Sequence, residues 1–205
     1  MPRCKCCKIK FKAKYFNQKF CLEKDECLLA HVEYSKEQQL KRNRKERKAK
    51  LPELYPKKYR GYLQDEINKL ARKIDAKLGH TTCIDCGKTL IGIKQVDGAH
   101  FTSVGSNTSI RYNLHNIHSA ASDCNFYSDT HHKGYEQGII KRYSKAYLDR
   151  IEGLKLEYKV IKLTNKEVAE KLAMVRKLNR DFETFEFDNG ISARDCFNMI
   201  IGIYN

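Results

Sequence analysis

Apolar residues recur at helical spacing in several parts of the chain. The clearest run contains Tyr59, Leu63, Ile67, Leu70, Ile74 and Leu78. This spacing predicts an amphipathic helix that ends at Gly79. The same period in residues 139–151 and from Asn165 to Phe182 predicts further helices. The chain is strongly apolar after Cys196, so we expect its end to pack against the rest of the molecule.

Two other stretches have different patterns. Residues 94–101 are short, partly β-branched and interrupted by Gly98, which predicts a strand that turns at its end and projects His100 into a groove. Residues 30–50 contain good helix formers but almost no apolar residue after Leu40, until Leu51-Pro52 breaks the pattern. This stretch is typical of a solvated basic helix or a partly disordered connector. Together the patterns predict an α+β protein.

The charge balance narrows the class of partner. The 205 residues include 40 Lys and Arg against 25 Asp and Glu, giving a formal net charge of +15. Such a balance indicates a polyanionic partner, and we expect DNA. No apolar run reaches the length of a bilayer and the N-terminus has no signal-peptide core, so we expect a cytoplasmic protein with no membrane partner.

The cysteines indicate metal binding. There are nine, an odd number, and several form close pairs, so reduced thiols on zinc are a better interpretation than disulfides. Cys4, Cys7, Cys21 and Cys27 predict a structural zinc ribbon. Cys6 is then a spare thiol, and His31 is a substitute ligand because the second pair is widely spaced. Metal binding would supply the folding energy of so small a piece.

A second cysteine group begins at Cys83 and Cys86, with Cys124 as a later partner. A second C-x-x-C pair would place its other thiol three residues before Cys124, where this chain has Ala121. The candidates for the fourth zinc ligand are His118, Asp123 and a water.

Between these cysteines lie residues suited to phosphodiester hydrolysis. His100 is our general base, since the pKa of a histidine lies near working pH. Asp97 and Asn125 offer oxygen ligands to a catalytic Mg²⁺ or Mn²⁺, and His132 or its neighbour His131 offers a nitrogen. Asn116 would hold the loop or the imidazole in place. The ordered set predicts a zinc-braced ββα-metal (HNH-like) nuclease module.

These motifs resemble a known family. Asp97-Gly98-Ala99-His100-Phe101, the run from Arg111 to His118, and Cys124-Asn125 resemble the NinG (Rap) family of lambdoid phage recombination endonucleases, over residues 1–152. The resemblance implies a structure-selective endonuclease that cuts branched DNA such as Holliday junctions, with His100, Asn116 and Asn125 as the matched motif positions. The chain departs from the family's usual Asp-Ala-Gly-His order and lacks the cysteine at Ala121.

The predicted organisation has four parts: a zinc ribbon at 1–31, a basic helical connector at 32–80, the nuclease module at 81–152 and C-terminal helices at 153–205. The predicted DNA-binding residues are Lys41, Arg42, Arg44, Lys45, Arg47, Lys48, Arg111 and Lys133. A homodimer would suit a near-symmetric junction, and phage or host recombination proteins are candidate partners. The alternative function is a catalytically inactive zinc-containing DNA-binding protein on a decayed HNH scaffold.

Overall fold

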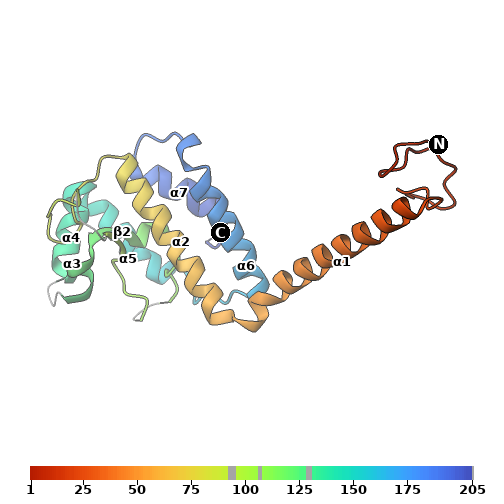
Figure 1. Cartoon of the computed structure of the whole chain (residues 1–205). Coiled ribbons are helices and arrows are strands. Elements are labelled where there is room, and N and C mark those ends of the chain that lie inside the picture. The colour runs from red at the N-terminus through yellow and green to blue at the C-terminus, as the bar shows by residue number, and fades with distance from the viewer. Residues whose placement is uncertain (92–95, 106–107, 128–130, 205) are drawn as a thin grey trace. The chain divides into compact units, whose positions relative to one another are not determined.

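The structure is a computed structural model that describes residues 1–205 except 92–95, 106–107, 128–130 and 205, and only the backbone at 125–127, 131 and 132. The chain divides into two compact units, Met1–Leu54 and Tyr55–Asn205 (Figure 1). Helix α2 therefore belongs to the second unit, although the sequence analysis grouped its residues with the connector.

The first unit combines a cysteine-rich loop region with one long helix, α1 (Asp25–Leu54). A small core of Cys4, Phe11, Phe20 and Cys27 holds the loop region together. Along α1, which is described throughout, only Cys27 and Pro52 are buried, as expected for a solvated basic helix. The helix continues through Pro52 and ends at Leu54, and the next helix begins at Pro56, so the chain does break within residues 51–56, two residues after Pro52. A proline this close to the helix end removes one of the last hydrogen bonds and leaves the preceding turns intact.

The second unit is organised around α2 (Pro56–Lys77). The helix begins at Pro56, a residue type favoured at the first helical position, and ends two residues before Gly79. The predicted amphipathic helix is confirmed. Its apolar face, with Leu63, Ile67, Leu70 and Ile74 buried, forms the centre of the main core.

Beside α2 lies a two-stranded antiparallel sheet. The bounds are β1 (Val96–His100), η1 (Leu114–Asn116), β2 (Ile117–Ala121), α3 (Ser122–Tyr127) and α4 (His131–Arg142). In its register Gly98 lies opposite Ser119 and His100 lies opposite Ile117. Gly98 is therefore a regular strand residue that does not interrupt β1, and the strand ends at His100. A Cβ at Gly98 would lie 2.8 Å from the Cβ of Asn68, so the glycine lets α2 approach the strand closely.

Further helices complete the second unit: α5 (Lys145–Glu157), α6 (Asn165–Arg180), η2 (Phe182–Thr184) and α7 (Gly190–Ile201). The α6 face that carries Val168 and Leu172 packs on α2 in the main core. Phe197 and Ile201 bring the apolar end of the chain into the same core, which confirms that this end docks on the protein. None of the described helices is long and apolar enough to cross a membrane.

A buried ion pair joins α7 to α2. Arg194 and Asp75 are both fully buried, and Arg194 Nη2 donates to Asp75 Oδ1 at 2.6 Å. The other carboxylate oxygen of Asp75 accepts the Ser119 backbone N–H at 2.7 Å, which attaches β2 to the pair. The pKa of Asp75 is lowered although burial opposes it, because the positive charge of Arg194 favours the carboxylate. Three elements distant in sequence are thereby held together.

Candidate functional site

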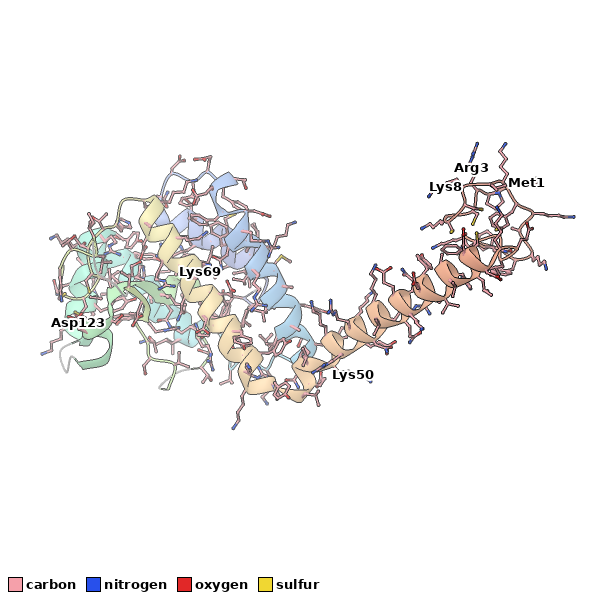
Figure 2. All side chains as sticks on the ribbon, in the orientation of Figure 1. Met1, Arg3, Lys8, Lys50, Lys69 and Asp123 are labelled. Carbon is pink, nitrogen blue, oxygen red and sulfur yellow. The ribbon has the colours of Figure 1, made fainter. Side chains whose placement is uncertain are left out.

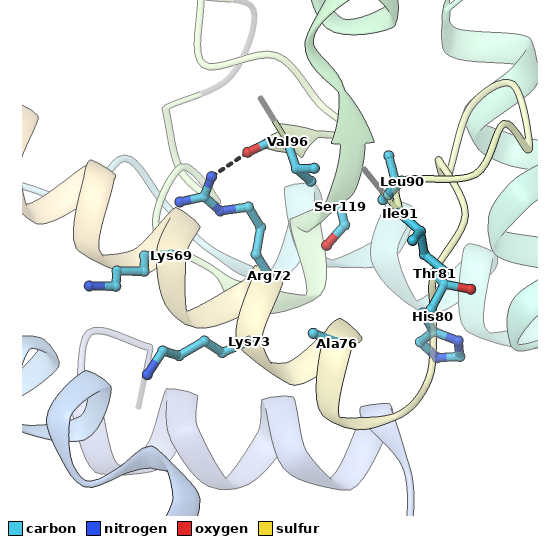
Figure 3. A pocket seen from close by; sticks show the side chains of 10 residues that line it. All are labelled: Lys69, Arg72, Lys73, Ala76, His80, Thr81, Leu90, Ile91, Val96 and Ser119. Atoms are coloured by element: carbon cyan, nitrogen blue, oxygen red, sulfur yellow. Dashed lines mark hydrogen bonds between the residues drawn. The ribbon is translucent and has the colours of Figure 1, made fainter. Parts of the chain in front are cut away.

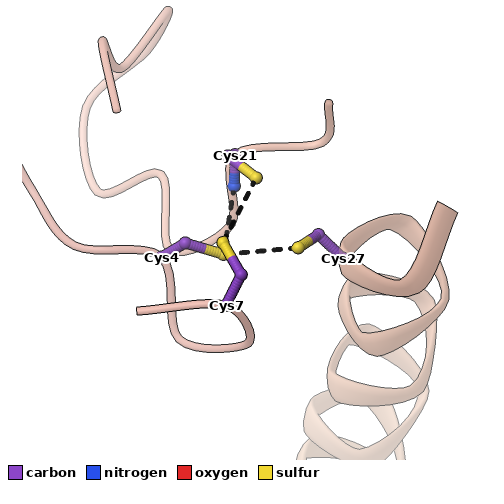
Figure 4. A group of neighbouring side chains, drawn as sticks. All are labelled: Cys4, Cys7, Cys21 and Cys27. Atoms are coloured by element: carbon purple, nitrogen blue, oxygen red, sulfur yellow. Dashed lines mark hydrogen bonds between the residues drawn. The ribbon is translucent and has the colours of Figure 1, made fainter. Parts of the chain in front are cut away.

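The first cysteine group has the geometry of a closed zinc site. The Cys4 N–H donates to the Ile9 carbonyl at 2.9 Å and the Lys8 N–H to the Cys4 carbonyl at 3.0 Å, forming a tight turn that we call the first knuckle (residues 3–10). The sulfurs of Cys4, Cys7, Cys21 and Cys27 all lie within 4.8 Å of one another (Figure 4). Cys4 and Cys27 Sγ are 3.8 Å apart, and Cys7 and Cys21 Sγ are 3.9 Å apart. Zinc–sulfur bonds of about 2.3 Å in a tetrahedron require sulfur separations of about 3.8 Å, so these four thiols fit zinc.

The second cysteine group repeats the same turn, which we call the second knuckle (residues 82–89). The Cys83 N–H donates to the Lys88 carbonyl at 2.8 Å and the Gly87 N–H to the Cys83 carbonyl at 3.1 Å. The thiols of Cys83, Cys86 and Cys124 converge within 4.8 Å and could hold zinc. At the position of the missing cysteine, the Ala121 N–H donates to Cys83 Sγ at 3.3 Å.

The candidates for a fourth ligand have other contacts. His118 is fully buried, and its Nδ1 lies 3.2 Å from the Tyr135 hydroxyl. The described metal-ligand group does not include His118. Asp123 is exposed and pairs with Lys88 at 2.6 Å. The cluster formed by the described side chains therefore has three thiols.

The second knuckle is attached directly to β2 and α4. The Ile84 N–H donates to the Ser119 carbonyl at 3.0 Å. On the other side, α4 presents Gly134 and Gly138 to the knuckle. A Cβ on Gly138 would lie 1.6 Å from the Ile84 carbonyl oxygen, so only glycine permits this approach. The knuckle therefore braces the strand that pairs with the His100 strand.

His100 lies at the end of β1 in a partly buried position. Its Nε2 is 3.0 Å from the Arg111 carbonyl oxygen and 3.1 Å from Gln64 Nε2. Burial lowers the pKa of His100 to about 4, because desolvation disfavours the imidazolium, while the Arg111 carbonyl opposes this shift. The imidazole is therefore neutral near pH 7 and able to accept a proton.

Gln64 is a site residue that the sequence analysis missed. It is buried on α2, where its Oε1 accepts from Arg111 Nε at 3.0 Å and its Nε2 donates to Asn68 Oδ1 at 2.8 Å. Gln64 thus connects Arg111 and His100 to the central helix. Two amides four residues apart beside the apolar stripe of α2 were the available signal, since such a pair shares one helix face.

Asn116 fixes the loop between the two strands. It is fully buried, and its Oδ1 accepts the Thr102 N–H at 2.8 Å while its Nδ2 donates to the Thr102 carbonyl at 3.0 Å. The Phe101 N–H donates to the Asn116 carbonyl at 2.8 Å. These bonds connect the beginning of the loop to its end and fix the backbone next to His100.

The other predicted site residues fall into three groups. Asp97 lies in β1, half-buried. The side chains of Asn125, His131 and His132 lie outside the described residues. Side chains project from α1 along its whole length (Figure 2). Lys133 on α4 is exposed, and so are the predicted DNA-binding residues of α1: Lys41, Arg42, Arg44, Lys45, Arg47 and Lys48.

A cavity of about 480 Å³ lies between α2, the residues on either side of the second knuckle and the two-stranded sheet (Figure 3). Leu90, Ile91 and Val96 give it an apolar wall. Arg72 reaches across from α2 and donates to the Val96 carbonyl, whereas Lys69 and Lys73 point away. Arg72 therefore anchors the beginning of the strand that ends at His100.

Comparison with protein-family models gives a match over most of the chain. The search of curated proteins and the search of solved structures found none. The family model described as "Bacteriophage Lambda NinG protein" matches residues 1–184, which include both cysteine groups, His100 and Asn116, and end before α7. Because this match spans most of the chain, the protein belongs to the family of the bacteriophage lambda NinG protein.

Proposed function

We propose that this protein is a metal-dependent DNA endonuclease that hydrolyses phosphodiester bonds in branched recombination intermediates such as Holliday junctions. The observation that carries the proposal is the environment of His100, a neutral imidazole fixed at a strand end by a backbone carbonyl. The order of strand, pinned loop, strand and helix from β1 to α3 supports it, since an HNH-like site requires this order.

His100 would act as the general base. When its Nε2–H donates to the Arg111 carbonyl, Nδ1 keeps its lone pair and can take a proton from the attacking water. Asn116 would keep the ring in this orientation through the loop backbone, and Gln64 would contribute from α2 by holding Arg111, whose carbonyl accepts the His100 bond. General-base catalysis of this kind contributes roughly 10²- to 10⁴-fold to the rate.

A bound Mg²⁺ or Mn²⁺ would neutralise charge on the phosphate and on the leaving oxygen. Asp97 fits such a hard cation because its carboxylate offers oxygen. It lies on β1 three residues before His100, so the regular alternation of the strand places the two side chains on opposite faces. Asn125 and His132 remain the other predicted ligands.

The substrate class follows from charge. The net charge of +15 and the exposed cations of α1 favour a phosphate backbone as the partner. Arg111, held by Gln64 beside His100, would contact the phosphate that is cut. The preference for branched DNA comes from the family resemblance and is the part of the proposal that needs a direct test.

The test is cleavage of a labelled four-way junction beside a linear duplex of the same sequence, using zinc-loaded protein with and without added Mg²⁺ or Mn²⁺. We expect metal-dependent cutting of the junction, and a loss of about 100-fold or more in rate for His100→Ala. Binding of the junction by His100→Ala should stay within about two-fold of wild type.

His80→Ala is the matched control, because His80 is a half-buried histidine that lines the cavity beside α2 and whose ring packs against Tyr143 rather than against His100. It should cut like wild type. Tight junction binding without cutting in either metal would reject the enzyme and favour the inactive DNA-binding protein.

A further inference from the structure

The first unit contains a cavity that the proposed chemistry does not use. It measures about 380 Å³ and lies between the loop at residues 15–20 and one face of α1. Four aromatic rings line it, together with amide and hydroxyl groups and two cations. The lining residues used here are Tyr15, Phe20, His31, Tyr34, Lys19 and Arg42. Its volume falls within the range of about 300–1,000 Å³ typical of small-ligand sites.

The loop wall of this cavity is rigidly built. The Gln18 N–H donates to the Tyr15 carbonyl at 3.3 Å, and Asn17 adopts a positive φ of 62°, so the chain forms a tight turn. The buried Gln18 side chain accepts the Lys14 N–H at 2.7 Å and donates to the Phe20 carbonyl at 2.8 Å. Phe20 is followed by Cys21 of the zinc group, so the metal site and the wall form one structure.

The helix wall carries an aromatic ring surrounded by cations. Tyr34 packs on Phe20 with ring centroids 5.6 Å apart. Lys19 Nζ donates to the Tyr34 hydroxyl at 2.6 Å, which lowers the pKa of Tyr34. The Nζ atoms of Lys19 and Lys5 lie 4.8 Å and 5.1 Å from the centre of the same ring.

The chemistry of this lining selects for a flat, anionic ligand. Among the described residues that line the cavity, none is acidic, and Arg42 continues the row of cations along α1. Aromatic faces bind nucleobases by stacking, and Gln38, Gln39 and Asn17 can bond to base edges. A base within a duplex is already stacked and cannot enter such a site.

We propose that this cavity binds an unpaired nucleotide of the DNA substrate, with the base against Tyr34 and Tyr15 and its phosphate at Lys19 and Arg42. The proposal rests on the DNA-directed function above and assigns a task to the first unit. That unit recognises the unpaired strand at a branch, while the second unit carries His100.

The test measures binding by full-length, zinc-loaded protein without Mg²⁺ or Mn²⁺, so that no cutting occurs. The probes are a single-stranded oligonucleotide and a branched DNA with one single-stranded arm, each carrying 2-aminopurine at one unpaired position, and a blunt duplex. Tyr34→Leu should weaken binding to unpaired DNA roughly 5- to 150-fold, the effect of losing one stacked base, and abolish the quenching of 2-aminopurine. Duplex affinity should not change.

Two controls separate stacking from charge and from folding. Tyr34→Phe keeps the ring and should retain quenching. Arg42→Ala should weaken binding to single strands more than Lys48→Ala does, because both remove one exposed charge from α1 but only Arg42 lines the cavity. Zinc content should equal that of wild type in every variant.

The outcomes are distinguishable. If wild type binds junctions but Tyr34→Leu and Tyr15→Ala lose nothing on unpaired DNA, or lose as much on duplex, this proposal is wrong and the endonuclease proposal stands. If wild type binds unpaired DNA through Tyr34 but cuts no junction, only the endonuclease proposal is wrong. A protein that binds no DNA overturns both.

Discussion

The two knuckles have the same backbone but are stabilised in different ways. In each, the first cysteine donates its N–H to the carbonyl five residues later, and a bridge pairs the flanking residues, Arg3 with Lys10 and Thr82 with Thr89. The first knuckle forms a group of four thiols, completed by Cys27 at the beginning of α1. The second has three thiols among its described side chains and is bonded to β2 and packed on α4.

This difference separates two uses of the same motif. The core of the first unit contains few residues, two of them zinc-ligand candidates, so without metal there is little apolar surface to hold it. The second knuckle belongs to a core that also contains Phe101, Tyr135 and Ile151. Metal should therefore determine whether the first knuckle folds. The second knuckle should fold without metal, because packing against β2 and α4 already specifies its structure.

Removal of metal should have the largest effect. Structural zinc contributes roughly 10–16 kcal/mol in small domains at pH 7, so chelation should unfold the first knuckle and leave the second unit folded. Limited proteolysis of the full chain, with fragments mapped by mass spectrometry, should show rapid cleavage within residues 1–27 and protection of 55–205. Equal sensitivity of both regions would contradict the comparison.

Gly138→Ala should disrupt the second knuckle through packing alone. The new methyl group would overlap the Ile84 carbonyl, so we expect the free energy of unfolding of the second unit to fall by about 1–3 kcal/mol. Gly153→Ala in α5 is the control, since a Cβ there meets no atom within 4 Å, and it should raise stability by about 0.5–1 kcal/mol. Urea unfolding of both variants measures the difference, and similar midpoints would refute the packing argument.

Acid should weaken the second unit through its buried histidines. Burial lowers the pKa of His115 to about 4 and holds that of His118 well below its ordinary value. Below about pH 6.5 the unfolded chain binds protons that the folded chain does not. The free energy of unfolding should then fall as pH decreases towards 4, by up to about 1.4 kcal/mol per pH unit for each histidine.

His118→Asn isolates one of these contributions. Asparagine carries no titrating group, so the variant should lose one histidine's share of the pH slope, whatever its stability at pH 7. Urea unfolding at pH 7, 6 and 5, compared with wild type in the same buffers, gives the difference and cancels any loss of zinc common to both. Parallel curves would show that His118 titrates normally in the folded protein.

The smallest effect concerns the residue after the second cysteine of each knuckle. Both residues are left-handed, Lys8 with φ of 63° and Gly87 with φ of 71°. A residue with a Cβ at such a φ lowers the stability of the fold by about 1 kcal/mol relative to glycine. Lys8→Gly should therefore stabilise the first knuckle, and Gly87→Ala should destabilise the second. Competition for zinc with a chelating dye checks the first variant and urea unfolding the second. The same sign for both would mean that contacts of the Lys8 side chain outweigh its backbone.

What the sequence predicted depended on local patterns. We could predict the four-thiol group and the apolar stripes of α2 and α6 from local spacing. Spacing alone indicates which residues lie on one helix face and which cysteines can bind one metal ion. The role of Gly98 could not, because the helix that passes close to it comes from residues far earlier in the chain. Gln64 was missed for the same reason, since its partners Arg111 and His100 lie 47 and 36 residues away.

The Asp75–Arg194 pair makes folding of the strand that carries His100 depend on the order in which the chain is synthesised. The two residues are 119 positions apart, so β1 and β2 leave the ribosome long before Arg194 does. Until α7 is made, closing the fold would bury Asp75 without Arg194, its main counter-charge, at a cost of several kcal/mol. A nascent chain would therefore keep the His100 strand unlocked until α7 has been translated, well after both strands of the sheet have been made.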